Sequence, residues 1–302
     1  MTQHPTQHQT ADITQAVLDR LADHTDPRFR QIITAVVKHA HALVREVDLK
    51  PDEWMATIQF LTQVGQMCDA KRQEFILLSD TLGISMLVVE LEQKRRSAVA
   101  VIDPSATVAP TEATVQGPFF WEGAPELALG SDLGAGMPGE PTYYSGRVID
   151  THGRPLPGCR MDIWSGDGDG VYDMQMGDKV GMRLRARFHS DAEGRYHFWS
   201  IKPTYYPVPD DGPVGGMLDR MGRHPNRPGH IHLMAHKEGH VPLTTHLFPA
   251  DSPFLDSDAV FGVRDSLILP FEKHPPGTAP DGRVLDRPFH TAHYDICLAP
   301  AA

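Results

Sequence analysis

Short apolar runs separated by glycine and proline turns fill the C-terminal two thirds of this 302-residue chain, and they restrict its fold more than any other feature. Helical periodicity ends in the segment DPSATVAPTEATVQGPFFWEGAPE, residues 103–126. From Tyr143 onward the runs are YYSGRVID, CRMDIWS, RYHFWSI, HIHLMAH, DSLILPF and HYDICLA. Strands at this spacing are typical of an antiparallel β-sandwich.

The first hundred residues have the spacing of amphipathic helices. Apolar residues at steps of three and four predict a helix over residues 27–48. Asp26 suits the N-cap of this helix, and Pro27 suits its first position. Further helices are predicted over residues 12–23, from Pro51 through Val64, over 70–79 and over 81–95.

The change of periodicity divides the chain in two. We predict an α+β protein in which a helical region, residues 1–105, precedes an antiparallel β-sandwich, residues 106–302. The apolar stripe of the helix at 27–48 needs a partner surface, and a second subunit could supply it.

Charge and cysteine content exclude several classes of protein. A formal net charge of −11 argues against nucleic-acid binding, and no apolar run approaches the ~20 residues of a membrane span. The N-terminus lacks the apolar core of a signal peptide. Three separated cysteines, Cys68, Cys159 and Cys297, predict reduced thiols in a cytoplasmic protein and no thiolate zinc site. Neither GxGxxG after a strand nor a Walker motif occurs, so nucleotide chemistry is not expected.

The segment NRPGHIHLMAH, residues 226–236, places two histidines one residue apart. Residues two apart share a face only on an extended strand, so His230 and His232 would direct both imidazoles to one place. Such a pair can supply two nitrogen ligands to a metal. In a chain with 17 histidines, it can equally be structural or solvent-facing.

Three tyrosines stand in unusual surroundings. Tyr172 follows the acidic turn GDGDG, which lacks the further ligand spacing of an EF-hand, and Tyr205 and Tyr206 lie between prolines in IKPTYYPVPDDG. A tyrosine is ordinarily a core or surface residue. A phenolate is also a hard oxygen ligand suited to high-valent iron, and only a strong Lewis acid would hold it ionised at neutral pH.

The run GRVIDTHGRPLPGCRMDIWSGDGDGVY resembles the signature of intradiol ring-cleaving dioxygenases, and GRHPNRPGHIH looks like the segment that carries their histidine ligands. The resemblance implies one mononuclear, non-haem Fe(III) per subunit, held by Tyr172, Tyr206, His230 and His232. Tyr206 is preferred to Tyr205 because of its spacing to PVPDDGPVGG. The resemblance also implies that Tyr206 is the tyrosinate displaced when substrate binds. It further implies that Arg227 stabilises negative charge on the ring, although a surface arginine paired with an acid is the alternative.

Three further segments resemble the branch of this family that acts on catechols and on hydroxyquinol (benzene-1,2,4-triol). They are KRQEFILLSDTLGISMLV, TEATVQGPFFWEGAP and LTTHLFPADSPFLDSDAVFGVRDSLI, and the third is most similar to the members that act on hydroxyquinol. The implied reaction is cleavage of hydroxyquinol by O₂ to 3-hydroxy-cis,cis-muconate or maleylacetate. Catechol or a chlorocatechol is the alternative substrate, and a non-catalytic β-sandwich binding module is the alternative of another class. The resemblance implies a homodimer formed through the N-terminal helices, with a phospholipid at the interface.

The same resemblance implies a substrate pocket lined from both halves of the chain. Its positions are Leu77, Asp80, Val115, Gln116, Gly117, Pro118, Phe119, Val208, Pro209 and Val260. Asp80 could accept a hydrogen bond from a third ring hydroxyl, or it could be a helix cap or a solvated turn residue. Tyr144 and Gln116 depart from the family pattern, which expects apolar residues there. His246 could orient a ligand or substrate or be a simple strand residue; Tyr205, His224, His236 and His240 are expected to be structural.

Overall fold

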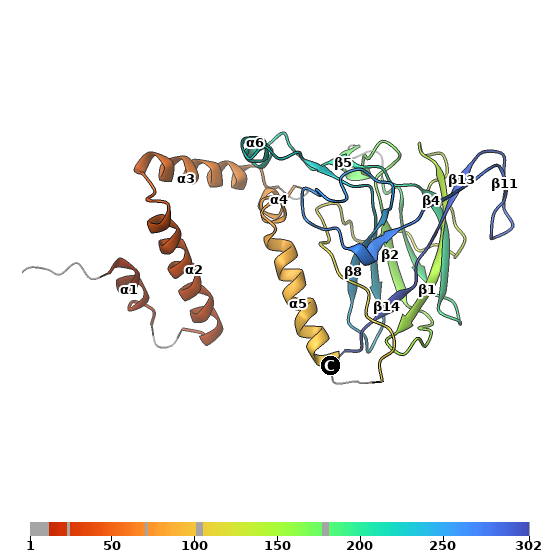
Figure 1. Ribbon diagram of the computed structural model, residues 1–302, viewed down its shortest axis with the longest axis horizontal. Coiled ribbons are helices and arrows are strands. Elements are labelled where there is room, and N and C mark those ends of the chain that lie inside the picture. The colour runs from red at the N-terminus through yellow and green to blue at the C-terminus, as the bar shows by residue number, and fades with distance from the viewer. Residues whose placement is uncertain (1–11, 23–24, 70–71, 101–104, 177–180, 302) are drawn as a thin grey trace, which may run out of the picture. The chain divides into compact units, whose positions relative to one another are not determined.

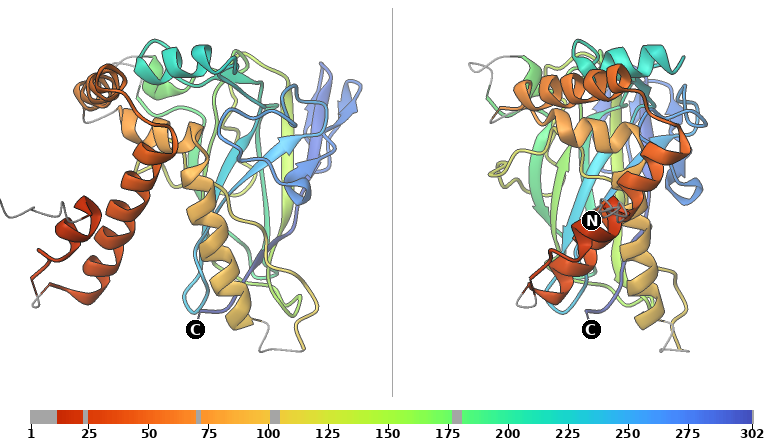
Figure 2. Two further views of the ribbon diagram at one scale, coloured as in Figure 1. Left: turned by 60° about the vertical axis from the view of Figure 1, so that its left-hand side comes forward. Right: turned by 90° about the vertical axis from the view of Figure 1, so that its left-hand side faces the viewer.

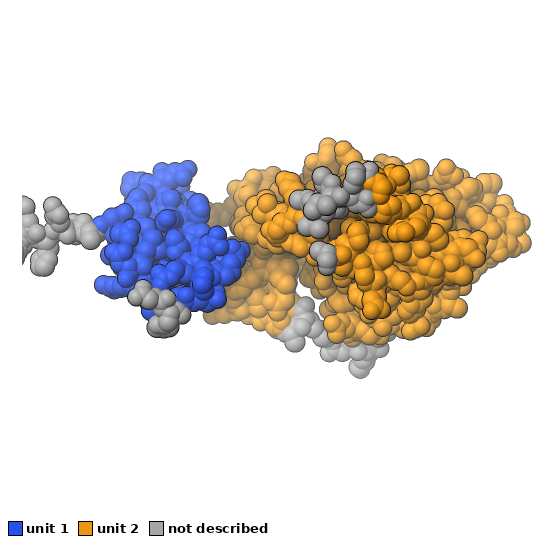
Figure 3. All heavy atoms as spheres, turned by 90° about the horizontal axis from the view of Figure 1, so that it is seen from below, with its two compact units in different colours: residues 1–63 blue, residues 64–302 orange. Residues whose placement is uncertain are grey.

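The computed structural model describes residues 12–22, 25–69, 72–100, 105–176 and 181–301. The chain forms two compact units, residues 1–63 and residues 64–302, which Figure 3 colours separately. The second unit holds the strands together with helices α4 (Glu74–Thr81) and α5 (Ile84–Ala100). The division at residues 105 and 106 stays a prediction.

Local sequence signals account for the helices of the first unit. They are α1 (Ile13–Leu18), α2 (Pro27–Glu46) and α3 (Pro51–Gln66), the last of which continues into the second unit. The Asp26 carboxylate accepts the backbone N–H of Phe29 at 2.7 Å and Pro27 occupies the first turn, so the predicted N-cap is confirmed. The helix predicted over 12–23 ends earlier, at Leu18, and residues 23 and 24 lie outside the described residues.

The two remaining predicted helices are present with shifted ends. The first begins at Glu74 rather than residue 70, and residues 70 and 71 lie outside the described residues. Gly83 separates the two helices because its φ of +74° is a left-handed conformation that glycine adopts without steric cost. The second helix then continues to Ala100, beyond the predicted end at residue 95.

Two five-stranded sheets form the body of the second unit (Figures 1 and 2). The first has the order β3 (Arg185–His189), β2 (Arg160–Trp164), β7 (Ile231–His236), β8 (Leu243–Pro249), β9 (Ile268–Leu269). The second has the order β10 (Glu272–His274), β13 (Phe289–His293), β1 (Pro141–Asp150), β14 (Ile296–Leu298), with β4 (Arg195–Ile201) also paired to β1. The short ladders are β5 (Tyr206–Pro207) with β6 (Asn226–Arg227) and β11 (Gly277–Thr278) with β12 (Val284–Leu285). The other short elements are α6 (Pro213–Arg220), η1 (Asp173–Gln175) and η2 (Asp265–Leu267).

The prediction that the sheets are purely antiparallel is wrong, because both sheets are mixed. β1 pairs in parallel with β13 and β14, and β8 pairs in parallel with β9. One register relates both C-terminal strands to β1, since Ser145 pairs with His293 and Val148 pairs with Ile296. The C-terminal segment therefore runs beside β1 as one interrupted strand in the same direction, a pairing between distant segments that local periodicity does not encode.

The core lies between the two sheets. Alternate residues of the strands point inward, as the period of two predicts. The large buried side chains of this core include Tyr144, Met161, Ile163, Phe188, Phe198, Ile231, Leu233 and Leu247. Residues one position away, such as Trp164 and His232, are buried on the opposite face of the first sheet.

Candidate metal centre

A row of buried polar and aromatic side chains crosses four strands of the first sheet. Arg185 of β3 pairs with Trp164 of β2, Trp164 with His232 of β7, and His232 with His246 of β8. Trp164 stacks on the His232 imidazole, with ring centroids 4.5 Å apart and planes inclined by 13°. The predicted strand placement of the HxH pair is thus confirmed for His232, while His230 directly precedes β7.

The acidic turn before Tyr172 brings the two tyrosines together. The Asp167 carboxylate accepts the backbone N–H groups of Asp169 at 3.0 Å and Val171 at 2.9 Å. Gly170 has φ +80°, and a β-carbon there would lie 2.8 Å from Cβ of Tyr206. Glycine is required at this position because the backbone adopts a left-handed conformation and passes directly against Tyr206.

Four donor atoms converge in this buried region. The Tyr172 hydroxyl lies 3.0 Å from Nε2 of His232 and 3.4 Å from the Tyr206 hydroxyl, which in turn lies 3.3 Å from Nε2 of His230. Tyr206 is 4% exposed, whereas its neighbour Tyr205 is 45% exposed. Two phenol oxygens and two imidazole nitrogens therefore share one space, and Tyr205 lies outside it.

The protonation states of these groups suit a bound cation. Nδ1 of His230 lies 2.8 Å from the carbonyl oxygen of Pro228, so it carries the proton and Nε2 presents a lone pair to the site. Burial, aided by the positive charge of Arg227, lowers the pKa of His230 to about 3. Burial and then the neighbouring His230 lower the pKa of His232 well below its ordinary value. Both imidazoles are thus neutral, which is the state in which histidine can bind a metal.

The pKa values of the two phenols shift upward instead, which also favours the neutral form. Burial and the adjacent Tyr206 raise the pKa of Tyr172 well above its ordinary value. Burial also raises the pKa of Tyr206, although the Arg227 guanidinium opposes that rise. Only a strongly polarising cation would ionise both phenols at neutral pH. This donor set, two hard oxygens and two nitrogens, fits a trivalent iron better than a soft ion.

Arg227 reaches the donor set from β6. It is 2% exposed, and its Nη1 lies 3.2 Å from Nε2 of His230 and 3.5 Å from the Tyr206 hydroxyl. The other edge of its guanidinium pairs with the buried Asp258. Arg227 is therefore an interior residue beside the proposed ligands, not a surface arginine.

His246 completes a group of three buried imidazoles. The ligand atoms of His230, His232 and His246 all lie within 4.8 Å of one another. The His246 ring centroid is 4.3 Å from that of His232 and 4.5 Å from that of His230. Neither ring nitrogen of His246 makes a well-formed hydrogen bond to a described residue, although the backbone of Val115 is close enough to oppose the fall of its pKa that burial causes.

Half of the predicted substrate-binding residues line a cavity of about 390 Å³. These are Leu77, Pro118, Phe119, Val208 and Pro209. Phe119 stacks on Tyr172 with ring centroids 4.4 Å apart, which places this cavity wall against a proposed ligand. Pro207, which follows Tyr206 in β5, also lines the cavity.

The other predicted substrate positions lie elsewhere around the centre. A β-carbon at Gly117 would lie 3.5 Å from Cε1 of His232. Asp80 is buried, and the charges of Arg227 and Asp258 both reach its carboxyl. Val115 and Val260 are also buried. None of these four lines the 390 Å³ cavity.

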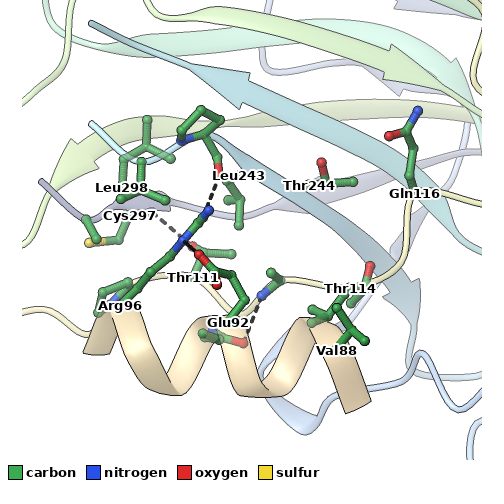
Figure 4. A pocket seen from close by; sticks show the side chains of 17 residues that line it. Val88, Glu92, Arg96, Thr111, Thr114, Gln116, Leu243, Thr244, Cys297 and Leu298 are labelled. Atoms are coloured by element: carbon green, nitrogen blue, oxygen red, sulfur yellow. Dashed lines mark hydrogen bonds and ion pairs between the residues drawn. The ribbon is translucent and has the colours of Figure 1, made fainter. Parts of the chain in front are cut away.

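Gln116 lines a separate cavity of about 380 Å³ between α5 and the strands β8 and β14 (Figure 4). Val88, Leu243 and Leu298 form part of its apolar wall. The guanidinium of Arg96 lies at one end and donates to the carbonyl oxygen of Pro242 at 3.4 Å. The side chain of Gln116 thus belongs to this cavity, while the backbone after it leads to Gly117 beside His232.

Sequence reasoning missed three residues that support the centre. Trp164 stacks on His232, and Arg185 donates to the carbonyl oxygen of Phe119 at 2.6 Å. Arg185 also forms a buried two-point ion pair with Asp173, the residue after Tyr172. The strand RARFH that carries Arg185 was not predicted. Its alternating pattern is the signal that could have found it.

Comparisons with known proteins identify the family. The family described as "Dioxygenase" matches residues 115–300, and "Catechol dioxygenase N terminus" matches residues 26–99. Hydroxyquinol 1,2-dioxygenase of Rhodococcus opacus is 45% identical over 98% of this chain and 99% of its own. The 6-chlorohydroxyquinol 1,2-dioxygenase of Cupriavidus pinatubonensis is 46% identical over 88% of this chain and 93% of its own.

Solved structures resemble the whole chain. Hydroxyquinol 1,2-dioxygenase from Pseudomonas putida DLL-E4 has a TM-score of 0.83 at 41% identity, covering 96% of this chain and 98% of that one. Catechol 1,2-dioxygenase from Pseudomonas arvilla C-1 has a TM-score of 0.81 at 30% identity, covering 97% and 93%. Within the described part of the chain, no helix is both long and apolar enough to cross a bilayer.

Proposed function

The chain belongs to the intradiol dioxygenase family, and on that premise we propose that it cleaves hydroxyquinol between two adjacent hydroxylated carbons with incorporation of both atoms of O₂. The observation that carries this proposal is the convergence of two phenols and two imidazoles in one buried site. Family membership makes the chain an enzyme and removes the alternative of a non-catalytic binding module. The product would be 3-hydroxy-cis,cis-muconate or maleylacetate.

We further propose that Tyr172, Tyr206, His230 and His232 hold one mononuclear, non-haem Fe(III). The separations of 3.0–3.4 Å between their donor atoms and the neutral state of both imidazoles support this ligand set. When bound, the ion supplies Lewis acidity that ionises the phenols and draws electron density from an aromatic diol.

The two tyrosines have different roles in this proposal. Tyr172 is fully buried against Phe119, and its backbone N–H donates to the side chain of Gln175 at 2.8 Å, so it is held in place. Tyr206 lies in a two-residue strand whose next residue, Pro207, lines the cavity. Tyr206 is therefore the ligand that accepts a proton from the incoming diol and moves aside.

Arg227 stabilises the negative charge that develops on the deprotonated ring. Its Nη1 lies at hydrogen-bond distance from the same two groups, Tyr206 and His230, beside which the substrate oxygens would lie. A fixed guanidinium in a water-poor site acts strongly on developing charge, because little solvent screens it.

Oxygen uptake by the iron-loaded protein tests the substrate. We expect kcat/KM for hydroxyquinol to exceed that for catechol tenfold or more, which corresponds to about 1.4 kcal/mol of transition-state discrimination. The reverse preference would support the same reaction with catechol or a chlorocatechol as the substrate. Absence of uptake with every diol would contradict the proposed reaction.

Colour tests the ligand set. Phenolate bound to Fe(III) gives a red-brown charge-transfer band, and we expect Tyr172→Phe to abolish or strongly weaken it. Tyr205→Phe is the matched control, because Tyr205 is exposed and should leave the band unchanged. A colourless wild-type protein with a full complement of iron would contradict these ligands.

We also propose that the enzyme is a cytoplasmic homodimer that associates through its N-terminal helices, with a phospholipid at the interface. The exposed apolar side chains of α2, among them Phe29, Val36 and Leu43, support a partner surface there.

A further inference from the structure

A second buried charge lies directly behind Arg227, and no step proposed above uses it. Asp258 is 5% exposed and belongs to the loop between β8 and η2. Its Oδ1 accepts a hydrogen bond from Arg227 Nε at 3.0 Å, and its Oδ2 accepts one from Nη2 at 3.3 Å. This pairing occupies one edge of the planar guanidinium and leaves Nη1 to face His230 and Tyr206.

The loop holds the Asp258 carboxylate from its other side. The backbone N–H of Gly262 donates to Oδ2 at 2.9 Å, and that of Val260 donates to Oδ1 at 3.3 Å. Each carboxylate oxygen thus has one backbone donor and one guanidinium donor. A carboxylate satisfied in this way has a fixed orientation, and it transmits that orientation to Arg227.

The backbone conformation of this loop is adapted to the Arg227–Asp258 ion pair. A β-carbon at Gly262 would lie 2.9 Å from Nη2 of Arg227 and 3.2 Å from Oδ2 of Asp258, so a larger residue would disturb the pair. Phe254 and Phe261 adopt positive φ values of 67° and 58° on either side of Asp258. Bulky residues rarely adopt this conformation, which costs on the order of 1–3 kcal/mol and persists only where the surroundings impose it.

Both partners are charged in the folded protein. Burial lowers the pKa of Arg227, but the Asp258 carboxylate together with Tyr206 and Tyr172 opposes that fall, so the net shift is upward. Burial likewise raises the pKa of Asp258, and the Arg227 guanidinium outweighs that effect, so the net shift is downward. An arginine at this depth without its carboxylate would be an unpaired buried charge, which is strongly destabilising.

We propose that Asp258 is a positioning residue for ring cleavage, which fixes the Arg227 guanidinium so that Nη1 alone meets the negative charge developing on the substrate. This inference rests on the proposed function, since it assigns Asp258 a purpose through the role of Arg227. A group that interacts with developing charge stabilises the transition state more than it stabilises the bound substrate. Loss of Asp258 should therefore lower kcat while KM changes little.

The test compares Asp258→Asn, Arg227→Met and the double variant with wild type, using oxygen uptake expressed per bound iron. We expect Asp258→Asn to lower kcat at least tenfold, to change KM less than threefold, and to retain iron and the visible band. In the Arg227→Met background, Asp258→Asn should change kcat less than twofold, because the residue through which it acts is gone. Asp256→Asn is the matched control, an exposed acid two residues away in the same loop that should behave as wild type.

Two outcomes of this comparison would overturn the proposal. One is an equal loss of kcat from Asp258→Asn with and without Arg227. The other is loss of iron or of folded protein with kcat per iron unchanged, which would mean a merely structural role. Asp258→Glu, which keeps the negative charge, should recover part of the kcat lost in Asp258→Asn. If kcat of Asp258→Glu is no higher than that of Asp258→Asn, the positioning role is also contradicted.

Thermal unfolding of the same four proteins without iron provides a second readout. Each single variant leaves one buried charge unpaired, whereas the double variant removes both, so we expect the double variant to be more stable than either single one. Purely additive changes in Tm would overturn the pairing. A wild-type protein that consumes no O₂ with any diol would contradict the proposed function instead, and the unfolding cycle would still decide the Arg227–Asp258 coupling.

Discussion

Among single residues, the buried acids near the centre have separate tasks. Asp258 pairs with Arg227, and Asp173 pairs with Arg185. Among the described residues, Asp80 forms no such ion pair: burial raises the pKa of its carboxyl, while a hydrogen bond from Ser85 and the charge of Arg227 oppose that rise. A carboxylate has about four acceptor sites, so Asp80 can accept a hydrogen bond from a ligand in addition to the one from Ser85.

Asp80 therefore provides the first residue-level prediction. If Asp80 accepts a hydrogen bond from the third hydroxyl of hydroxyquinol, Asp80→Ala should lower kcat/KM for the triol about 10- to 100-fold, the effect of one charge-assisted hydrogen bond. Catechol lacks that hydroxyl and serves as the internal control, with an expected change below about threefold. Equal losses of kcat/KM for hydroxyquinol and catechol would contradict this role of Asp80.

The cysteines provide a second residue-level prediction. Burial raises the pKa of the Cys159 and Cys297 thiols to about 11, whereas Cys68 is only half-buried. At pH 8 only about one in a thousand of the two buried thiols is ionised, and the thiolate is the reactive form. A thiol reagent should modify one cysteine per native chain at pH 8 and all three in denaturant, and Cys68→Ser should abolish the native reaction.

The sign of the accompanying pH effect follows from the same shifts. Both thiols keep their protons more firmly in the folded than in the unfolded chain, so their contribution to stability is complete below pH 9 and is lost as pH rises through about 11. Rapid reaction of more than one thiol in the native protein at pH 8 would contradict the buried environment of Cys159 and Cys297.

Among the secondary-structure elements, β1 carries the largest share of the second sheet. It pairs with β4 on one side and with β13 and then β14 on the other. The exchange from β13 to β14 occurs beside Gly146, where the carbonyl oxygen of Tyr294 would lie 1.8 Å from any β-carbon. The absence of a side chain at Gly146 is thus what allows the segment between β13 and β14 to pass so close to β1.

Gly146→Ala should consequently destabilise the protein by about 3 kcal/mol, because the backbone of one strand must shift. Differential scanning calorimetry should show Tm lowered by roughly 5–10 °C. Gly216→Ala is the matched control: Gly216 lies in α6, a β-carbon there meets nothing within 4 Å, and a stabilisation of about 0.5–1 kcal/mol is expected. Equal Tm values for Gly146→Ala and wild type would contradict the close approach of Tyr294.

At the scale of the whole molecule, the first unit exposes an apolar surface of the kind that a subunit buries against its partner. The side chains of Phe29, Ile32, Val36 and Leu43 in α2, and of Val47 at its C-cap, are all exposed. Their spacing places them on one face, and monomeric proteins rarely leave such a continuous apolar stripe in water. This pattern is the physical basis for the proposed dimer.

Light scattering coupled to gel filtration checks this association. We expect wild type to elute with twice the mass of one chain, and Val36→Glu, which puts a charge at an exposed apolar position of α2, to elute as a monomer. Lys38→Glu changes a charge at an exposed polar position of the same helix and should leave the dimer intact. A monomeric wild-type protein would contradict association through these helices.

The sequence by itself determined the features that depend on near neighbours. The cap at Asp26, the periodicity of α2 and the extended placement of His232 follow from residues within a few positions of each other. The candidate ligands came from the resemblance of two short motifs to the intradiol dioxygenase family, since a short motif can be matched without knowledge of the tertiary structure. Tyr206 was preferred to Tyr205 on spacing alone, and its burial beside Tyr172 is consistent with that choice.

Only the tertiary structure decided which distant residues meet. Asp258 lies 31 positions beyond Arg227, and Arg185 lies 66 positions beyond Phe119. Trp164 faces His232 solely because β2 and β7 pair in one register. The parallel pairing of β1 with the C-terminal strands has the same origin. These contacts form when the folded chain closes long loops and packs its sheets, and that closure leaves no signature in local periodicity.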